Sequence, residues 1–338
     1  MPKNKNNQII AELTSLLPQL LDDGVGIDSD LALSLGTLSG PEIFSLLPLT
    51  NRLRRSHCGP KIALCAITNA KSGRCPEDCA YCAQSISYDT GVEIFPLIGV
   101  DKLSEHAHAA AACGVENFSV VTSGTAVDCG HEQAEIMAML REIGKQEMGP
   151  CASLGFLDAD MAVSYRDAGL KHYHHNLETA RSFFSQICTT HDYERAVATV
   201  KTAKEAGLYV CSGGIMGLGE NWAQRVELAL TLRELQVDSI PLNFLQPVSG
   251  TPLADQPGLT PFQALLTISM FRLVCPTCDI RICGGRQRTL GDFQSFLFAA
   301  GANGLMVGNY LTTSGRQWLD DCRLLADWAV FDEVLTDE

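Results

Sequence analysis

Short β-rich runs alternate with helical patterns through most of this chain of 338 residues, and this alternation restricts its possible folds more than any other feature. Eight runs are predicted strands, at 61–68, 117–122, 149–154, 171–176, 208–214, 239–245, 279–283 and 304–308. Predicted amphipathic helices lie between them, at 101–113, 131–146, 159–168, 193–206, 222–235 and 261–274. Strands that alternate with helices in this way predict a parallel (β/α)8 barrel of the TIM type.

A doubly wound sheet would give the same alternation, so the number of strands alone does not choose between the two folds. The positions of the polar motifs favour the barrel, because they repeatedly follow the strand ends, where a barrel keeps its active site. Residues 1–60 are a predicted helical extension, since 8–22 and 41–55 have helical periodicity. The barrel is then expected over 61–318, and an acidic helix or tail over 319–338.

Composition and charge exclude several classes of protein. A hydrophobic fraction of 46% is enough for a large core, and a net charge of −14 argues against nucleic acid as a partner. The sequence has no run of 18 apolar residues, so we expect no membrane-spanning helix. The N-terminal MPKNKNNQII has no apolar stretch typical of a signal peptide, so a cytoplasmic location is expected.

Three of the fourteen cysteines form a short motif, Cys75, Cys79 and Cys82, directly after the first predicted strand. Their C-x3-C-x2-C spacing can supply thiolates to three irons of a [4Fe–4S] cluster and leaves the fourth iron open to a small molecule. Zinc is the alternative, but a structural zinc site needs four ligands. The isolated Cys58, Cys65, Cys188 and Cys322 are interpreted as small buried residues.

This motif resembles that of the radical S-adenosylmethionine superfamily, and the longer string CPEDCAYCAQS at 75–85 resembles the biotin synthase family in particular. The likeness runs from about residue 50 to about 315. It includes the strings at 175–178, 211–220, Asn243 with 250–253, 284–286, and 301–303 with 311–313. Together these strings are specific, although each alone is weak. The last strands would then form the part associated with biotin and thiamin synthesis.

The resemblance implies a definite chemistry. S-adenosylmethionine would bind the open iron, and one electron from the reduced cluster would cleave it to a 5′-deoxyadenosyl radical. Such a radical removes hydrogen from an unactivated C–H bond, which protein side chains cannot do. The implied substrate is dethiobiotin, into which sulfur from a second cluster is inserted. The resemblance also implies an electron donor such as flavodoxin or ferredoxin, and a homodimer.

The resemblance assigns roles to individual residues of this sequence. Asn176, Glu178 and Ile215 match contacts to S-adenosylmethionine, and Tyr81 would lie beside the cofactor or shield the cluster. The predicted substrate contacts are Asn243 to the ureido ring, Thr312 and Thr313 near the carboxylate, and His174, which stands where the family has asparagine.

The second cluster departs from the family pattern of three cysteines and one arginine around a [2Fe–2S] centre. Cys151, Cys211 and Arg281 match, but the remaining cysteine position is Ser119. Cys283 lies two residues beyond Arg281, so both side chains should face the same side of a strand. We hypothesise that Cys151, Cys211 and Cys283 hold an altered auxiliary cluster, a four-iron cube whose open iron carries the sulfide, with Arg281 offsetting its negative charge.

The sequence leaves alternatives open for the second cluster, for one further cysteine pair and for the function. Ser119 would be an oxygen ligand of a [2Fe–2S] centre, or Cys283 would be core filler and the second cluster missing. The pair Cys275 and Cys278 has thioredoxin-like spacing without the matching βαβ context, so it is either a pair without chemistry or a redox or sulfur-relay site. The alternative functions are a maturase or mutase of the same superfamily and a metal-cluster binding protein without turnover.

Overall fold

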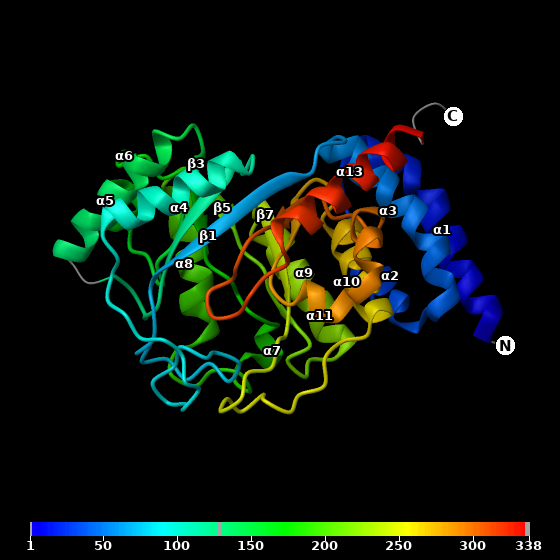
Figure 1. Ribbon diagram of the computed structural model, residues 1–338. Helices are drawn as coiled ribbons and strands as arrows, with labels where there is room; N and C mark the ends of the chain where they lie inside the picture. The colour runs from blue at the N-terminus through cyan, green and yellow to red at the C-terminus, as the bar shows by residue number, and fades with distance from the viewer. Residues whose placement is uncertain (1, 128–129, 335–338) are drawn as a thin grey trace.

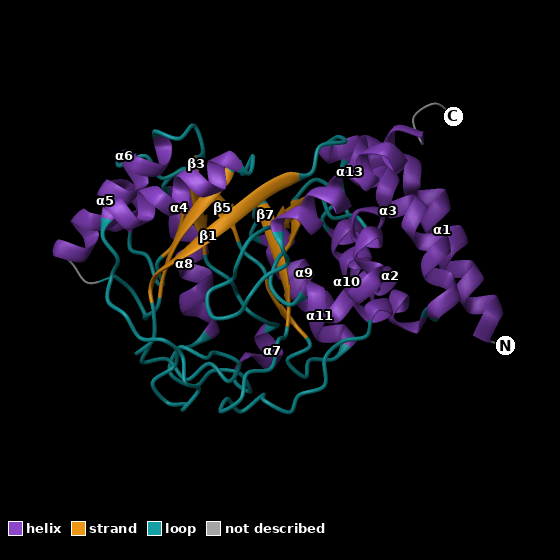
Figure 2. Ribbon diagram, viewed as in Figure 1, coloured by secondary structure: helices purple, strands orange, loops and turns teal. Residues whose placement is uncertain are grey.

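The strands form one parallel sheet that closes into a barrel in the computed structural model, which describes residues 2–127 and 130–334. Figure 1 shows the course of the chain, and Figure 2 shows the strands enclosed by helices. The strands are β1 (Ala63–Lys71), β2 (Asn117–Thr122), β3 (Gly149–Ser153), β4 (His172–His174), β5 (Tyr209–Cys211), β6 (Gly214–Met216), β7 (Ser239–Phe244), β8 (Asp279–Ile282) and β9 (Gly304–Met306).

The hydrogen-bonded order is β5-β4-β3-β2-β1-β9-β8-β7-β6, and a further pairing between β5 and β7 closes the ring. The predicted strand at 208–214 is divided in the structure, because β5 and β6 are separated by Ser212 and Gly213 but share β7 as a neighbour. The two segments therefore occupy one position of an eight-membered barrel. The predicted (β/α)8 fold is confirmed.

The interruption between β5 and β6 has a steric cause. A Cβ on Gly213 would lie 2.0 Å from the carbonyl oxygen of Pro241, and a Cβ on Gly214 would lie 2.4 Å from that of Glu178. Only glycine permits such close approach of two backbones. The chain can thus pass tightly against β7 while it leaves the regular strand.

Helices cover the outside of the barrel, and the six predicted ones agree with the structure to within two residues at each end. They are α4 (Val100–Ala112), α5 (His131–Gly144), α6 (Ala159–Asp167), α8 (Tyr193–Glu205), α9 (Trp222–Glu234) and α10 (Pro261–Val274). Side chains that accept hydrogen bonds from the first turn define several starts, such as Asp158 before α6 and Asp192 before α8.

The helices that do not alternate with barrel strands come mainly from the two ends of the chain, and they gather at one side of the molecule (Figure 1). At the N-terminus these are α1 (Pro2–Asp23), α2 (Ser29–Ser34) and α3 (Ile43–Cys58), with 3-10 turns at Leu35–Thr37 and Gly40–Glu42. The helices near the C-terminus are α11 (Arg286–Leu290), a 3-10 turn at Gly291–Ser295, α12 (Phe296–Ala299) and α13 (Trp318–Val334). The short helix α7 (Arg181–Phe184) lies apart from these helices. The guanidinium of Arg54 on α3 lies 5.6 Å from the ring centre of Trp328 on α13, which joins the two ends of the chain. The predicted tail extends to 335–338, which lie outside the described residues.

No helix in the described part of the chain is long and apolar enough to cross a membrane.

Side chains alternate between the lumen and the helical layer along each strand, as the period of two requires. On β1 Cys65 and Ile67 face the lumen, and on β2 Asn117, Ser119 and Val121 do so. Arg281 and Cys283 also face it together, as their spacing predicts. The loops that follow the strands lie at one end of the barrel, low in Figure 1, and they surround the mouth of this lumen.

Candidate active site

A cavity of about 370 Å³ occupies the lumen and opens among the loops at the carboxyl ends of the strands. Its lining comes from every position of the barrel, and it includes both polar groups near the mouth and thiols deeper inside. Active sites of (β/α)8 enzymes lie at this end of the barrel. The predicted site residues can therefore be located relative to one cavity.

The cysteine motif lies on the long loop between β1 and α4. The amide of Cys75 donates to the carbonyl of Gln84 at 2.9 Å, and the amide of Cys82 donates to the carbonyl of Cys79 at 2.9 Å. These bonds fold the loop so that the thiol of Cys82 interacts electrostatically with those of Cys79 and Cys75. Burial raises the pKa of Cys82 to about 11, so an iron centre would have to stabilise its thiolate.

Polar residues that match the S-adenosylmethionine site line the cavity next to this loop. Asn176 accepts a hydrogen bond from the amide of Gly213 at 3.1 Å and donates to Glu178 Oε2 at 3.4 Å. Tyr81 also hydrogen-bonds the Glu178 carboxyl, and Ile215 lies on β6 in the same lining. Burial raises the pKa of Glu178 to about 7. Its backbone has a φ of 66°, which few residues other than glycine adopt.

Residues that match the substrate contacts line the same cavity. The Oδ1 of Asn243 accepts from the amide of Gly284 at 2.9 Å, which leaves the NH2 group to point to another acceptor. Thr312 and Thr313 line the mouth on the loop after β9. His174 lines the wall on β4, and burial lowers its pKa to about 4, so the imidazole is neutral at pH 7.

Deeper in the lumen the structure brings together the thiols that match the auxiliary cluster. Cys151 on β3, Cys211 on β5 and Cys283 after β8 all line the cavity. Burial raises the pKa of each thiol, and the negative charge of neighbouring thiolates adds to the effect. Soft sulfur donors with no carboxylate among them fit an iron–sulfur cluster well.

Sequence reasoning missed a fourth thiol, Cys65 on β1, which also lines the cavity. Its charge interacts with Cys151, Cys211 and Cys283, and with the guanidinium of Arg281. The interpretation of Cys65 as a small buried residue is therefore incomplete. The signal that could have found it was the alternation along 61–68, on a strand that leads directly into the cysteine motif.

Arg281 is held by two neighbours at the base of the lumen. Its guanidinium donates to Asp279 Oδ2 at 3.0 Å and its Nε donates to Ser239 Oγ at 3.2 Å. A Cβ on Gly304 would lie 2.6 Å from the Cγ of Arg281, so a glycine on β9 makes room for this side chain. Arg281 thus presents a fixed positive charge close to Cys65 and Cys211.

Ser119 lies on β2 in the lining, at the position where the family pattern has a cysteine. Its Oγ is buried and has no hydrogen-bond partner. A buried hydroxyl without a partner costs stability unless a ligand or ordered water satisfies it. The lumen therefore has an unsatisfied polar atom beside its thiols.

Cys275 and Cys278 lie away from the cavity. They follow α10 at the amino end of β8, whereas the cavity opens at the carboxyl ends of the strands. Their thiols donate to the carbonyl oxygens of Ala229 at 3.6 Å and Val237 at 3.2 Å. The structure therefore does not bring this pair together with the other candidate residues.

Comparison with solved structures shows the fold alone. A methylornithine synthase superimposes with a TM-score of 0.80 at 16% identity, over 94% of this chain and 99% of that one. A maturase of the [FeFe]-hydrogenase superimposes with a TM-score of 0.81 at 14% identity, over 97% of this chain and 77% of that one.

Comparison of sequences is far more specific. The model of the radical SAM superfamily matches residues 70–232, and that of the biotin and thiamin synthesis associated domain matches 241–330. A biotin synthase of Trichlorobacter lovleyi is 53% identical over 90% of this chain and 92% of its own length. One of Geobacter sulfurreducens is 51% identical over 90% of this chain and 93% of its own length. The chain belongs to the biotin synthase family.

Proposed function

We propose that the protein converts dethiobiotin to biotin in this lumen with two iron–sulfur clusters, of which the second has an altered set of ligands. The enzyme class follows from the family, since a radical SAM enzyme of this kind inserts sulfur. The observation that carries the proposal is that one cavity is lined both by Cys82 of the cysteine motif and by Cys151, Cys211 and Cys283 inside the barrel.

Cys75, Cys79 and Cys82 would hold a [4Fe–4S] cluster with one open iron. When bound there, the cluster and S-adenosylmethionine supply a carbon radical that removes hydrogen from the substrate. Glu178 and Asn176 are mutually oriented and offer hydrogen-bond partners for the ribose and amino-acid parts of the cofactor. The Gly213–Gly214 segment brings the backbone of Ile215 close enough to line the adenosyl half.

Asn243 would recognise the ureido carbonyl of dethiobiotin, because the hydrogen bond from Gly284 directs the NH2 donor into the cavity. A neutral His174 offers one donor and one acceptor to the same ring. Thr312 and Thr313 supply hydroxyl groups for the substrate carboxylate at the mouth. The substrate would therefore lie between the catalytic cluster and the deep thiols.

Cys151, Cys211 and Cys283 would hold the auxiliary cluster that supplies sulfur, and Cys65 is a fourth thiol facing it. Arg281 offsets the negative charge of the thiolates while Asp279 and Ser239 hold it in position. Ser119 is not needed as a ligand, since thiolate is preferred to a hydroxyl by iron in such clusters. A four-iron cluster suits this donor set.

An electron donor such as flavodoxin or ferredoxin is part of the proposal, because the catalytic cluster must be reduced before each radical forms. A homodimer and a cytoplasmic location remain predictions from the family and the sequence. The cytoplasmic prediction is consistent with free thiols at all cysteines in the described ranges, since disulfides rarely persist in that compartment.

The test is anaerobic reconstitution with iron and sulfide, followed by metal analysis. We expect about eight irons per chain for the wild type, from two four-iron clusters, and about four for a Cys151→Ala/Cys283→Ala double variant. The matched control, Cys322→Ala on α13, should keep about eight. About four irons in the wild type would leave no auxiliary cluster and favour a maturase or mutase, and bound zinc would favour a metal-binding protein without turnover.

A further inference from the structure

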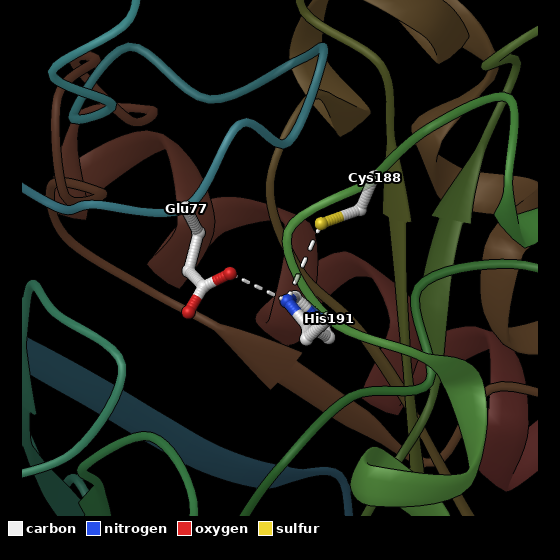
Figure 3. Close-up of side chains that lie close together, drawn as sticks. All are labelled: Glu77, Cys188 and His191. Carbon is white, nitrogen blue, oxygen red and sulfur yellow. Dashed lines mark hydrogen bonds and ion pairs between the residues drawn. The ribbon is translucent and has the colours of Figure 1, made fainter.

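Two acidic residues, Glu77 and Asp78, lie between the first two cysteines of the cysteine motif, and both bind a segment far along the chain. This segment, residues 187–191, lies between α7 and α8. Figure 3 shows the Glu77 side chain extended toward His191, with Cys188 on the other side of the imidazole ring. The loop that would hold the catalytic cluster is therefore joined to a second loop by its own carboxylates.

Glu77 joins three loops of the barrel. Its Oε1 accepts a hydrogen bond at 2.6 Å from the hydroxyl of Thr125, which lies in the loop after β2. Its Oε2 accepts from the hydroxyl of Thr190 and lies 2.7 Å from His191 Nδ1. The His191 ring packs edge-on against Phe156, with the ring centroids 5.1 Å apart. Both oxygens of this buried carboxylate thus have partners on other loops.

Asp78 binds the same segment mainly through backbone groups. Its Oδ1 accepts the amides of Thr189 at 2.8 Å and Thr190 at 3.2 Å, and its Oδ2 accepts from the Thr189 hydroxyl. Its own amide donates to Thr190 Oγ1 at 3.2 Å. One turn further on, the amide of Ala80 donates to the carbonyl of Ile187 at 2.8 Å. Hydrogen bonds to a carboxylate are stronger than neutral ones, so this network fixes how the two loops lie against each other.

The segment 187–191 belongs to the same connection as two residues that match contacts to S-adenosylmethionine. Asn176 and Glu178 follow β4, and the chain continues from them through α7 to 187–191 and then to α8. The network therefore has the cysteines for the catalytic cluster on one side and these two polar residues on the other. A ligand that is held from both sides binds tightly only if the two sides are fixed at the right separation beforehand.

We propose that Glu77 and Asp78 are positioning residues for S-adenosylmethionine, because they clamp the cysteine loop to 187–191 and so set the separation of the catalytic cluster from Asn176 and Glu178. Neither carboxylate lines the cavity, so both act through the loops that they join. The proposal rests on the proposed function in one respect, that S-adenosylmethionine binds between the cysteine motif and these two polar residues.

A metal ion held by Glu77, Cys188 and His191 is the competing interpretation, since their ligand atoms lie within 4.8 Å of one another. The separation of 2.7 Å between the imidazole nitrogen and the carboxylate oxygen is that of a direct hydrogen bond. Two ligands of a tetrahedral ion would lie further apart, at about 3.3 Å for bonds of about 2.0 Å.

The test is equilibrium dialysis of S-adenosylmethionine with reconstituted full-length protein, without reductant, with binding counted per catalytic cluster from the EPR signal of a reduced aliquot. Asp78→Ala should raise the dissociation constant about tenfold, the effect of losing about one charge-assisted hydrogen bond. Asp78→Asn keeps an oxygen for the two amides and should recover most of the affinity. Thr190→Val removes the hydroxyl that Glu77 and Asp78 share, and should also weaken binding. The control Asp89→Ala, at an exposed position on the same loop, should bind as the wild type does.

Hydrogen exchange of the metal-free protein gives a second readout that needs no cluster. Asp78→Ala should speed exchange of the Thr189 and Thr190 amides about tenfold, because they lose their acceptor. Amides in the middle of α8 should keep their wild-type rates, since the clamp acts on the loops and not on the whole fold.

Wild-type affinity in cluster-containing Asp78→Ala and Thr190→Val proteins would overturn the proposal, even if both hold less iron, because the network would then only stabilise the fold. If Asp78→Ala takes up no iron, the affinity of Thr190→Val decides between the same two outcomes. A metal ion beyond the two clusters that disappears in His191→Phe would establish the competing site instead. A wild type that holds its clusters but binds no S-adenosylmethionine would refute the proposed function itself, whereas the first outcome would leave that function standing.

Discussion

Replacement of Glu178 by glutamine tests how strongly the cavity holds this carboxyl in its neutral form. Burial in the lining raises its pKa from 4.5 to about 7, while Tyr81 and Asn176 offset part of the effect by hydrogen bonding. Glutamine has nearly the same shape and retains a carbonyl oxygen for Asn176. The substitution therefore removes the ionisation and little else.

The direction in which pH changes the free energy of unfolding follows from proton linkage. The folded protein holds the Glu178 proton up to about pH 7, whereas the unfolded chain releases it near pH 4.5. The neutral carboxyl thus stabilises the folded state fully below pH 4.5, and this contribution is lost as the pH rises to about 7. At 1.36 kcal/mol for each tenfold change in proton affinity, the whole effect is about 3 kcal/mol.

The assay is urea unfolding of metal-free protein at pH 5, 6, 7 and 8, under anaerobic conditions, with the wild type and Glu178→Gln compared at each pH. The variant should gain about 2 kcal/mol relative to the wild type between pH 5 and pH 8. Glu205→Gln, at an exposed position on α8, is the control and should change stability by less than about 0.5 kcal/mol throughout. A difference between Glu178→Gln and the wild type that does not vary with pH would show that the cavity does not favour the neutral Glu178 carboxyl.

Three further substitutions test other parts of the site. Gly214→Ala introduces a Cβ 2.4 Å from the Glu178 carbonyl oxygen, so thermal unfolding should show a loss of stability of about 1–3 kcal/mol. Titration should also show weaker binding of S-adenosylmethionine, and unchanged binding would contradict the close approach of the two backbones. Asn243→Asp still accepts from Gly284 but loses the NH2 donor, so calorimetry should show at least about tenfold weaker dethiobiotin binding, and equal affinity would argue against ureido recognition. Ser119→Ala removes a buried hydroxyl without a partner, so stability should stay level or rise by about 1 kcal/mol with iron content unchanged; a loss of iron would make Ser119 a ligand.

The fold could be predicted from the sequence because the barrel depends on patterns that repeat along the chain. The strand predicted at 117–122 coincides with β2, which has four consecutive buried residues and lies between helices α4 and α5 in the sequence. The division of the strand at 208–214 could not be predicted, since it depends on contact between Gly213 and the backbone of Pro241 on another strand. Periodicity describes one segment at a time and contains no information about such contacts.

The candidate site shows the same contrast. Cys283 could be paired with Arg281 because residues two apart on a strand share a face, and both line the cavity. Cys65 was missed although the same rule applies, because Ala63 and Ile67, the residues two positions away on its strand, offer no ligand atom.

We propose that a cluster on the cysteine motif beside the cavity and a second cluster on the thiols inside the lumen act together to make biotin. The most direct test is to incubate reduced, reconstituted protein with S-adenosylmethionine, with and without dethiobiotin, and to measure both 5′-deoxyadenosine and biotin. We expect both products to form when dethiobiotin is present, and biotin formation to be lost in the Cys151→Ala/Cys283→Ala variant. Formation of 5′-deoxyadenosine without biotin, or of biotin by that variant at the wild-type level, would contradict this proposal.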